Sequence, residues 1–370
     1  MAEWSNAPVL KTGDLRGSGS SNLSPSATAM GQNEHYYIGK RNLQSEHHWE
    51  PLDSETFHIT KPTVICLGGN GSIKPHNANF ICKVAQSLVG IKEPRWANEI
   101  ATTQDVDFIG IAYGNNYEDD NSTGSLTQSE ITTLTKSIFE PLYRDEKGQI
   151  RPDAQIIRNF NQITFFAHCH GAREAGNLIS RAMCNMLDSG IAHKTAEAAI
   201  GQLFAVSYAP IVTIPCPNLQ VITEKDGFLL GGPLLAPISN KFLDERFEKE
   251  NRGKGTVVFQ EDDYTISLIV SNMTQHGEVE HPVGTIQRDN HWQMVEKDFA
   301  YGDEVSRAMG VALSYSIVNS LKNQKSDNWT PRPPLKLILQ KVQSILGNSQ
   351  NSDFAHRIEQ IQNEQNGLIK

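Results

Sequence analysis

The segment of this sequence most suited to chemistry is AHCHG, residues 167–171, in which Cys169 lies between two histidines. An apolar run, QITFFA, precedes it, and a segment with helical spacing follows it. A sharp strand-to-helix turn holds its central residue in strained dihedral angles, and small residues two positions before and after it, here Ala167 and Gly171, relieve the crowding. A thiolate in such a turn is stabilised by the amino end of the following helix. The pattern therefore predicts a cysteine nucleophile at a tight turn.

The elements around this turn are expected to form an α/β fold. Apolar, β-branched runs are separated by segments of helical spacing, and the runs lack the in/out alternation of a half-exposed sheet. This order predicts a mostly parallel central sheet with helices on both faces. The expected strands are residues 63–67, 106–114, 162–167, 202–211, 218–226 and 264–272. The expected helices are residues 77–90, 129–142, 153–161, 171–187 and 306–321.

Composition divides the 370 residues into three parts. Residues 1–55 are rich in Ser, Gly, Asn and Gln, and such a composition buries too little apolar surface to offset chain entropy. This N-terminal extension is expected to be disordered or loosely attached, apart from docking around residues 36–38. Residues 56–322 carry the α/β pattern. Residues 323–370 read as a proline-bearing linker and a helical tail that packs on the domain or recruits a partner.

Charge and cysteine usage restrict the class of protein. A net charge of −9 argues against nucleic acid as a partner, because nonspecific binding needs a basic surface. Five cysteines without a CxxC pair are typical of free thiols in a reducing compartment. The N-terminus lacks the layout of a secretory signal, and no apolar run approaches the ~20 residues of a transmembrane helix. We therefore expect a soluble, cytoplasmic protein without a transmembrane segment.

The stretch FFAHCHGAREAGNLI resembles the nucleophile elbow of the α/β-hydrolase superfamily, which includes lipases, esterases and thioesterases. The resemblance spans roughly residues 63–321, and cysteine nucleophiles occur in the superfamily's dienelactone hydrolases. It implies an oxyanion hole made of two main-chain N–H groups. One would come from the loop LGGNGS, as Gly69 or Asn70, and the other from His170, the residue after the nucleophile.

The resemblance also implies that an acid and then a histidine follow the nucleophile along the chain. Asp226, at the end of a late strand, would be the acid that orients the histidine. His291 is the favoured base because it stands in a loop ahead of the final helix, and His276 and His281 are the alternatives. His168 is expected to pack and to form hydrogen bonds rather than to act as the base.

Other kinds of site have weaker signals. His168 and His170 lack a third ligand at a recognisable spacing, so no metal is expected. The glycine loop matches neither a Walker loop nor GxGxxG, and no cofactor is expected. A rival interpretation uses Ser72 with His170-x-x-x-Glu174, whose two side chains lie one helical turn apart. That set resembles the serine plus HxxxE arrangement of some nucleotidyl-transferring bacterial toxins.

The sequence thus favours a hydrolase that cleaves an ester or thioester bond through Cys169, His291 and Asp226, with an acyl-enzyme intermediate. The expected substrate is a small-molecule or lipid acyl compound. The alternative is a catalytically inactive, hydrolase-like scaffold whose terminal extensions bind a protein partner. The Asn- and Gln-rich ends also resemble those of bacterial effector proteins, which implies export into a host cell as a second localisation.

Overall fold

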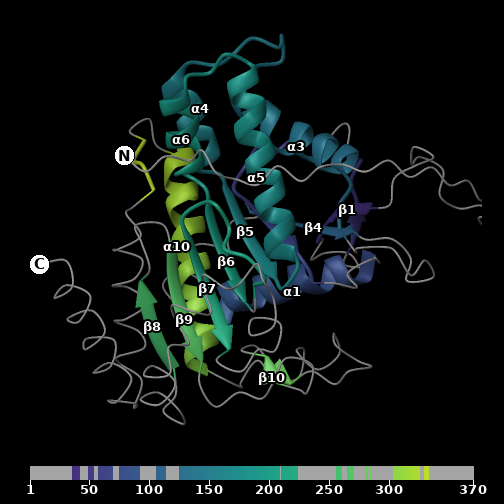
Figure 1. Ribbon diagram of the computed structural model, residues 1–370, viewed down its shortest axis with the longest axis vertical. Helices are drawn as coiled ribbons and strands as arrows, with labels where there is room; N and C mark the ends of the chain where they lie inside the picture. Colours follow the sequence, from purple (N-terminus) through teal and green to yellow (C-terminus); the bar gives the residue numbers. More distant parts are fainter. Residues whose placement is uncertain are drawn as a thin grey trace, which may run out of the picture. The chain divides into compact units, whose positions relative to one another are not determined.

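A mixed nine-stranded sheet forms the centre of the chain, in the order β2-β1-β4-β3-β5-β6-β7-β9-β8 (Figure 1). The computed structural model describes residues 36–41, 49–53, 57–69, 75–91, 106–113, 125–208, 210–223, 256–260, 265–270, 280–281, 284–285, 303–325 and 329–332. The strands are β1 (Tyr36–Lys40), β2 (Glu50–Pro51), β3 (Thr63–Leu67), β4 (Asp107–Tyr113), β5 (Ile163–His168), β6 (Phe204–Tyr208), β7 (Asn218–Thr223), β8 (Thr256–Gln260) and β9 (Thr265–Val270). A separate antiparallel pair consists of β10 (Glu280–His281) and β11 (Gly284–Thr285).

Six neighbouring strands of the sheet run parallel to one another, in the spatial order β4-β3-β5-β6-β7-β9. The edges are antiparallel, because β1 pairs with β2 and β4 on one side and β8 pairs with β9 on the other. A mostly parallel sheet of this kind confirms the predicted α/β class.

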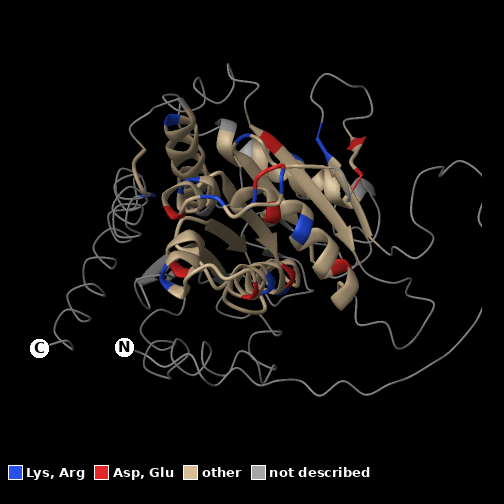
Figure 2. Ribbon diagram, turned by 90° about the horizontal axis from the view of Figure 1, so that it is seen from above, with Lys and Arg blue, Asp and Glu red and all other residues tan. Residues whose placement is uncertain are grey.

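The central strands are buried on both sides. Every residue of β3, β5 and β6 is buried, and none of these strands contains Lys, Arg, Asp or Glu. Figure 2 shows the strands of the sheet largely in tan, the colour of the other residue types. Successive side chains point to opposite faces. Val64 and Cys66 therefore pack in one core, while Ile65 and Leu67 pack in the other. Burial on both faces explains why these strands appear in the sequence as continuous apolar runs.

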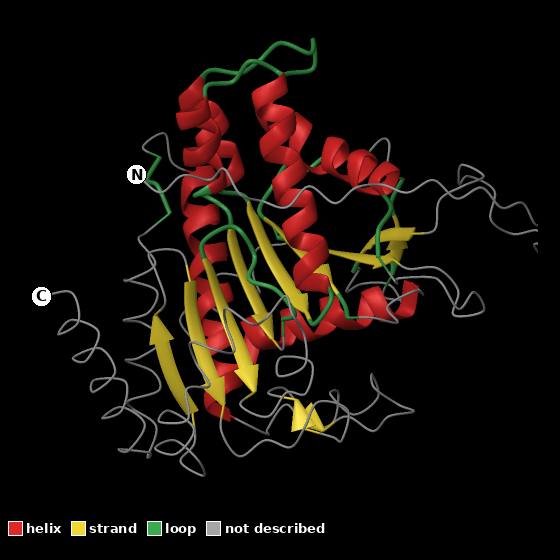
Figure 3. Cartoon of the chain, in the orientation of Figure 1, coloured by secondary structure: helices red, strands yellow, loops and turns green. Residues whose placement is uncertain are grey.

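Two layers of helices cover the sheet (Figure 3). The face that carries Val64 packs against α1 (Pro75–Ile91) and α10 (Asp303–Lys325). The opposite face packs against α3 (Gln128–Tyr143), α4 (Asp153–Phe160), α5 (Gly171–Asp188) and α6 (His193–Ile200). This arrangement is the three-layer α/β architecture, in which each amphipathic helix buries its apolar side on the sheet.

The strand order reverses between β3 and β5. The chain passes from β3 to β4 on one side, and then places β5 on the other side of β3. The carboxyl ends of β3 and β5 therefore lie side by side, and the connections that leave them diverge. Ligands of open α/β sheets bind at such a switch point.

The sheet and its packing extend beyond the boundaries predicted from composition. β1 lies within residues 1–55 and pairs with β4, with Tyr36 opposite Tyr113, in the region where docking was expected. Arg332 lies within the expected linker, yet it is buried and its main-chain N–H bonds to Gln202. Local composition did not predict the burial of Arg332, because long-range contacts rather than local hydrophobicity order this segment. The sequence patterns also did not predict α6 and β8.

Candidate active site

Cys169 lies between the end of β5 and the start of α5, at the carboxyl edge of the sheet. Its φ of 50° is the only positive value of a non-glycine residue in the described part of the chain. A side chain in this left-handed region costs about 1 kcal/mol or more, and such strain concentrates at functional sites. The structure therefore contains the strained turn that the AHCHG segment predicts.

Three main-chain hydrogen bonds hold Cys169 in this conformation. Its N–H donates to the carbonyl of Tyr208 at 3.1 Å, at the end of β6. Its own carbonyl accepts from the N–H groups of Ala172 at 3.2 Å and Ile211 at 3.3 Å. The bonds come from a strand, a helix and a loop, so the surrounding structure determines the strained geometry.

Glycines on two elements allow the loop after β3 to lie against this turn. A Cβ at Gly171 would be 2.3 Å from the carbonyl oxygen of Leu67, so the first turn of α5 packs directly on the end of β3. A Cβ at Gly69 would be 3.1 Å from the Cβ of Cys169 and 2.9 Å from Nδ1 of His168. No larger residue fits at either position without displacing the loop from the cysteine.

Two peptide groups beside Cys169 have an occupied carbonyl and an N–H group that bonds to none of the described residues. The Gly68 carbonyl accepts from the hydroxyl of Tyr113, and the Cys169 carbonyl accepts the two bonds given above. Within the described residues, the N–H groups of Gly69 and His170 donate to no protein acceptor. Main-chain N–H groups without an acceptor in the protein are the usual components of an oxyanion hole.

The imidazole of His170 contacts residues at the amino ends of two helices. Its Nε2 lies 2.8 Å from Oγ of Ser125 and 3.2 Å from Oε1 of Glu174. Glu174 is fully buried on the first turn of α5, and its Oε2 accepts from Asn177 at 3.3 Å. Ser125 precedes α3, whose start is fixed by a capping box between Thr127 and the third residue of the helix. The ring therefore links the amino ends of α3 and α5.

Two buried phenols border the turn and remain protonated. Burial raises the pKa of Tyr113 well above its ordinary value, and the charges of Glu174 and Cys169 raise it further. Burial also raises the pKa of Tyr208, with a smaller effect from Cys169. The ring of His168 stacks on Tyr208 with 4.4 Å between centroids, and His168 is buried. His168 thus has the packing role expected for it.

The other cysteines have environments that differ from that of Cys169. Cys66 is buried, and burial together with a hydrogen bond to Cys82 raises the pKa of its thiol. Burial likewise raises the pKa of Cys216. Cys184 is exposed on α5 in ordinary helical geometry. Only Cys169 combines partial exposure, a strained turn and neighbouring main-chain donors in the described part of the protein.

The structure brings together Cys169, Gly69 and His170, as the sequence predicted. Other predicted residues lie outside the described residues: Asn70, Ser72, Asp226, His276 and His291. The main chain of His281 forms part of β10, and its side chain is likewise outside the described part. The acid and the base of the predicted triad therefore stay predictions.

Sequence reasoning missed Tyr113 and Ser125. A usable signal existed for Tyr113, because it ends β4, and parallel neighbours bring their carboxyl ends to the same edge of the sheet. For Ser125 the only signal is its place just ahead of the TQSE capping sequence.

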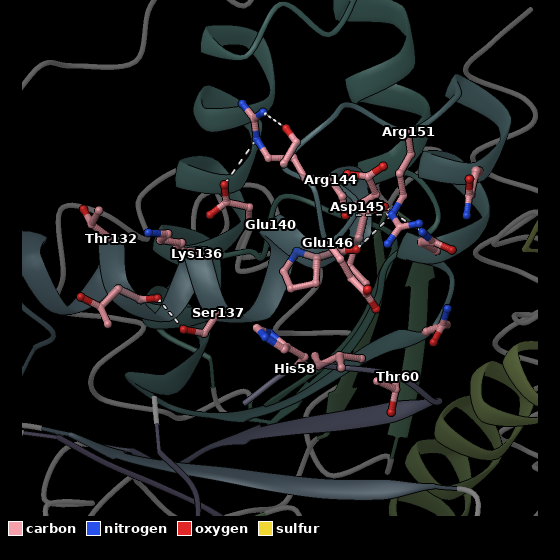
Figure 4. Close-up of a pocket in the computed structure, with 18 residues that line it drawn as sticks. His58, Thr60, Thr132, Lys136, Ser137, Glu140, Arg144, Asp145, Glu146 and Arg151 are labelled. Carbon is pink, nitrogen blue, oxygen red and sulfur yellow. Dashed lines mark hydrogen bonds and ion pairs between the residues drawn. The ribbon is translucent and has the colours of Figure 1, made fainter. Parts of the chain in front are cut away.

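One hollow formed by described residues lies at the opposite end of the strands. It has a volume of about 930 Å³ and is lined by residues that precede β3 and β5, such as Thr60 and Gln162, and by the end of α3. Figure 4 shows Arg144 of this cleft bonded to Glu140. Cys169 does not line the cleft, so the cleft is separate from the elbow. The described residues contain no group of three or more His, Cys, Asp or Glu side chains that could hold a metal ion.

No protein-family model matches this sequence, and no curated protein matches it at a significant level. None of the helices in the described part is long and apolar enough to cross a membrane. Functional inference therefore rests on the elbow at Cys169 and on the residues around it.

Proposed function

We propose that this chain is an α/β-hydrolase-like enzyme that cleaves an ester or thioester bond, with Cys169 as the nucleophile. The observation that carries the proposal is the strained turn at Cys169, next to the two unused N–H groups of Gly69 and His170. The nucleophile elbow of α/β-hydrolases has a strand–turn–helix of this kind, with one oxyanion donor after β3 and one after the nucleophile.

In the proposed reaction, Sγ of Cys169 attacks the carbonyl carbon of the substrate. The negative charge that develops on the carbonyl oxygen is stabilised by the N–H groups of Gly69 and His170. The bond to the leaving group breaks, the leaving group takes a proton, and a thioester forms on Cys169. Water then attacks this thioester, which releases the carboxylic acid and restores the thiol.

His291 and Asp226 complete the proposed triad. His291 would accept the thiol proton and return it to the leaving group, while Asp226 would hold the imidazole in the required tautomer. His276 and His281 are the alternative bases. The proposed substrate is an acyl compound, either a small molecule or a lipid.

The test is hydrolysis of a panel of p-nitrophenyl esters and acyl thioesters of increasing chain length, with intact-mass spectrometry to trap the acyl-enzyme. We expect turnover and a mass increase of one acyl group in the wild type, and neither in Cys169→Ala. Cys184→Ala is the matched control, because Cys184 is the exposed thiol of the same helix, and it should keep both signals.

Two other outcomes have a defined meaning. Turnover that survives in Cys169→Ala but disappears in Ser72→Ala would show that Ser72, rather than Cys169, is the nucleophile for these esters. Absence of turnover and of adduct in the wild type, with a Cys169 thiol that alkylating reagents leave unmodified, would favour the inactive scaffold.

A further inference from the structure

We propose that Tyr113 is a positioning residue that holds the Gly68–Gly69 peptide in the orientation required of an oxyanion donor. The inference rests on the proposed function and deepens it, because it identifies the group that forms one half of the oxyanion hole. In this role Tyr113 acts through the Gly68 carbonyl rather than on the substrate.

The contact is direct and buried. Tyr113 is the last residue of β4 and is 1% exposed, and its hydroxyl donates to the carbonyl of Gly68. Gly68 follows β3, which is the parallel neighbour of β4. The phenol therefore reaches from the end of one strand to the loop after the next strand.

This bond determines the direction of the Gly69 N–H. A trans peptide is planar, so the carbonyl of one residue and the N–H of the next point in opposite directions. The described part of the chain has no cis peptide bond. With the Gly68 carbonyl bonded to Tyr113, the Gly69 N–H must point away from Tyr113. A Cβ at Gly69 would be 3.1 Å from the Cβ of Cys169, so the residue that carries this donor lies against the cysteine.

The Gly68–Gly69 peptide needs such an anchor. Glycine adopts positive and negative φ with similar ease, so a peptide between two glycines can rotate at little steric cost. A rotated peptide would turn its carbonyl toward the developing oxyanion, which would repel it. The other donor, His170 N–H, needs no separate anchor, because the Cys169 carbonyl of the same peptide accepts two main-chain bonds. The raised pKa of Tyr113 keeps the donating proton on the phenol up to strongly alkaline pH.

The test compares two reactions of the same thiol in Tyr113→Phe. Acylation by a p-nitrophenyl ester passes through an oxyanion, whereas alkylation by iodoacetamide displaces iodide at a saturated carbon and forms none. We expect kcat for the ester to fall by about 10- to 100-fold with KM nearly unchanged, somewhat less than the loss on deleting a donor outright. The rate of alkylation, measured across pH, should stay within about twofold of the wild-type rate, because the thiol itself is not changed.

Tyr143→Phe is the matched control, because it removes a phenol hydroxyl from the far end of α3, away from the elbow. It should leave both reactions unchanged. Equal ester kinetics in Tyr113→Phe and Tyr143→Phe would overturn the inference, as would a parallel fall of acylation and alkylation in Tyr113→Phe. If Tyr113→Phe fails to fold, 4-fluorophenylalanine at position 113 fills the space of the hydroxyl but donates no hydrogen bond. The rates of acylation and of alkylation are then compared in that variant. A wild type that shows no acylation contradicts the proposed function itself, which is a different result.

Discussion

Buried polar groups lie at both ends of the parallel strands, but their hydrogen bonds differ. At the amino ends of β5 and β6, the guanidinium of Arg332 donates to the carbonyls of Gln202 at 2.7 Å and Asn161 at 2.9 Å, and to the hydroxyl of Ser316. At the carboxyl ends, the turn at Cys169 is strained, and the two N–H groups beside it donate to no acceptor within the described residues.

The comparison indicates that one end stabilises the fold and the other is available to a ligand. Burial lowers the pKa of Arg332 to about 9, so its guanidinium is still charged at neutral pH and needs the acceptors around it. Unused donors and strained dihedral angles, in contrast, lower stability and persist where function requires them. Substitutions at the two ends should therefore separate activity from stability.

The largest expected effect is on the reaction. Cys169→Ala should lower kcat/KM for the best ester of the panel by about 10³-fold or more, because the nucleophile is lost. The free energy of unfolding in urea should change by less than about 1 kcal/mol, since alanine keeps the backbone strain and loses little packing. Substantial residual turnover in Cys169→Ala would show that Cys169 is not the nucleophile.

The next largest effect is on the stability of the packing at the carboxyl ends of the strands. Gly171→Ala should lower the free energy of unfolding by about 3 kcal/mol or more, because the added Cβ would meet the Leu67 carbonyl oxygen at 2.3 Å. Gly176→Ala on the same helix is the control, because its Cβ would lie 3.4 Å from Pro215 and helix propensity favours alanine. Chemical denaturation of both variants measures the difference. Equal stability would mean that the start of α5 is not packed on β3.

At the amino ends of the strands, we expect a substitution to lower stability and to leave activity unchanged. Arg332→Met should lower the free energy of unfolding by about 2–3 kcal/mol, because the buried acceptors that Arg332 satisfies lose their donor. The kcat of the folded fraction should equal that of the wild type. Arg144→Met is a control at a partly exposed arginine and should cost less than about 1 kcal/mol. A fall in kcat in Arg332→Met would argue that the two ends are coupled.

The smallest effect compares two histidine–glutamate pairs with the same spacing. His170 and Glu174 are nearly or fully buried, whereas His193 and Glu197 on α6 lie 3.4 Å apart with both side chains more than half exposed. Glu174→Gln should lower kcat by about 10-fold, because an amide holds the His170 ring less firmly than a buried carboxylate does. Glu197→Gln should leave kcat unchanged. Steady-state kinetics of both variants test this expectation. Equal kcat values for the two variants would indicate that burial of the pair has no role in the reaction.

Much of the central fold could be predicted from local patterns. Continuous apolar runs marked β3, β5 and β6 because strands buried on both faces need no polar positions. The turn at Cys169 was predictable for the same kind of reason, since small residues at 167 and 171 and an apolar run before them are adjacent in sequence. Gly69 and His170 followed from the resemblance to the α/β-hydrolase elbow, and the structure places Gly69 against Cys169.

The sequence by itself therefore determined the α/β class, the strained turn and the glycine loop, all of which depend on neighbouring residues. Only the tertiary structure decided that Tyr113 bonds to Gly68 and that Ser125 bonds to His170, because each pair is 45 residues apart. The same holds for Arg332, which lies 130 residues from Gln202. Such contacts depend on the order of strands in the sheet, and no short-range periodicity encodes that order.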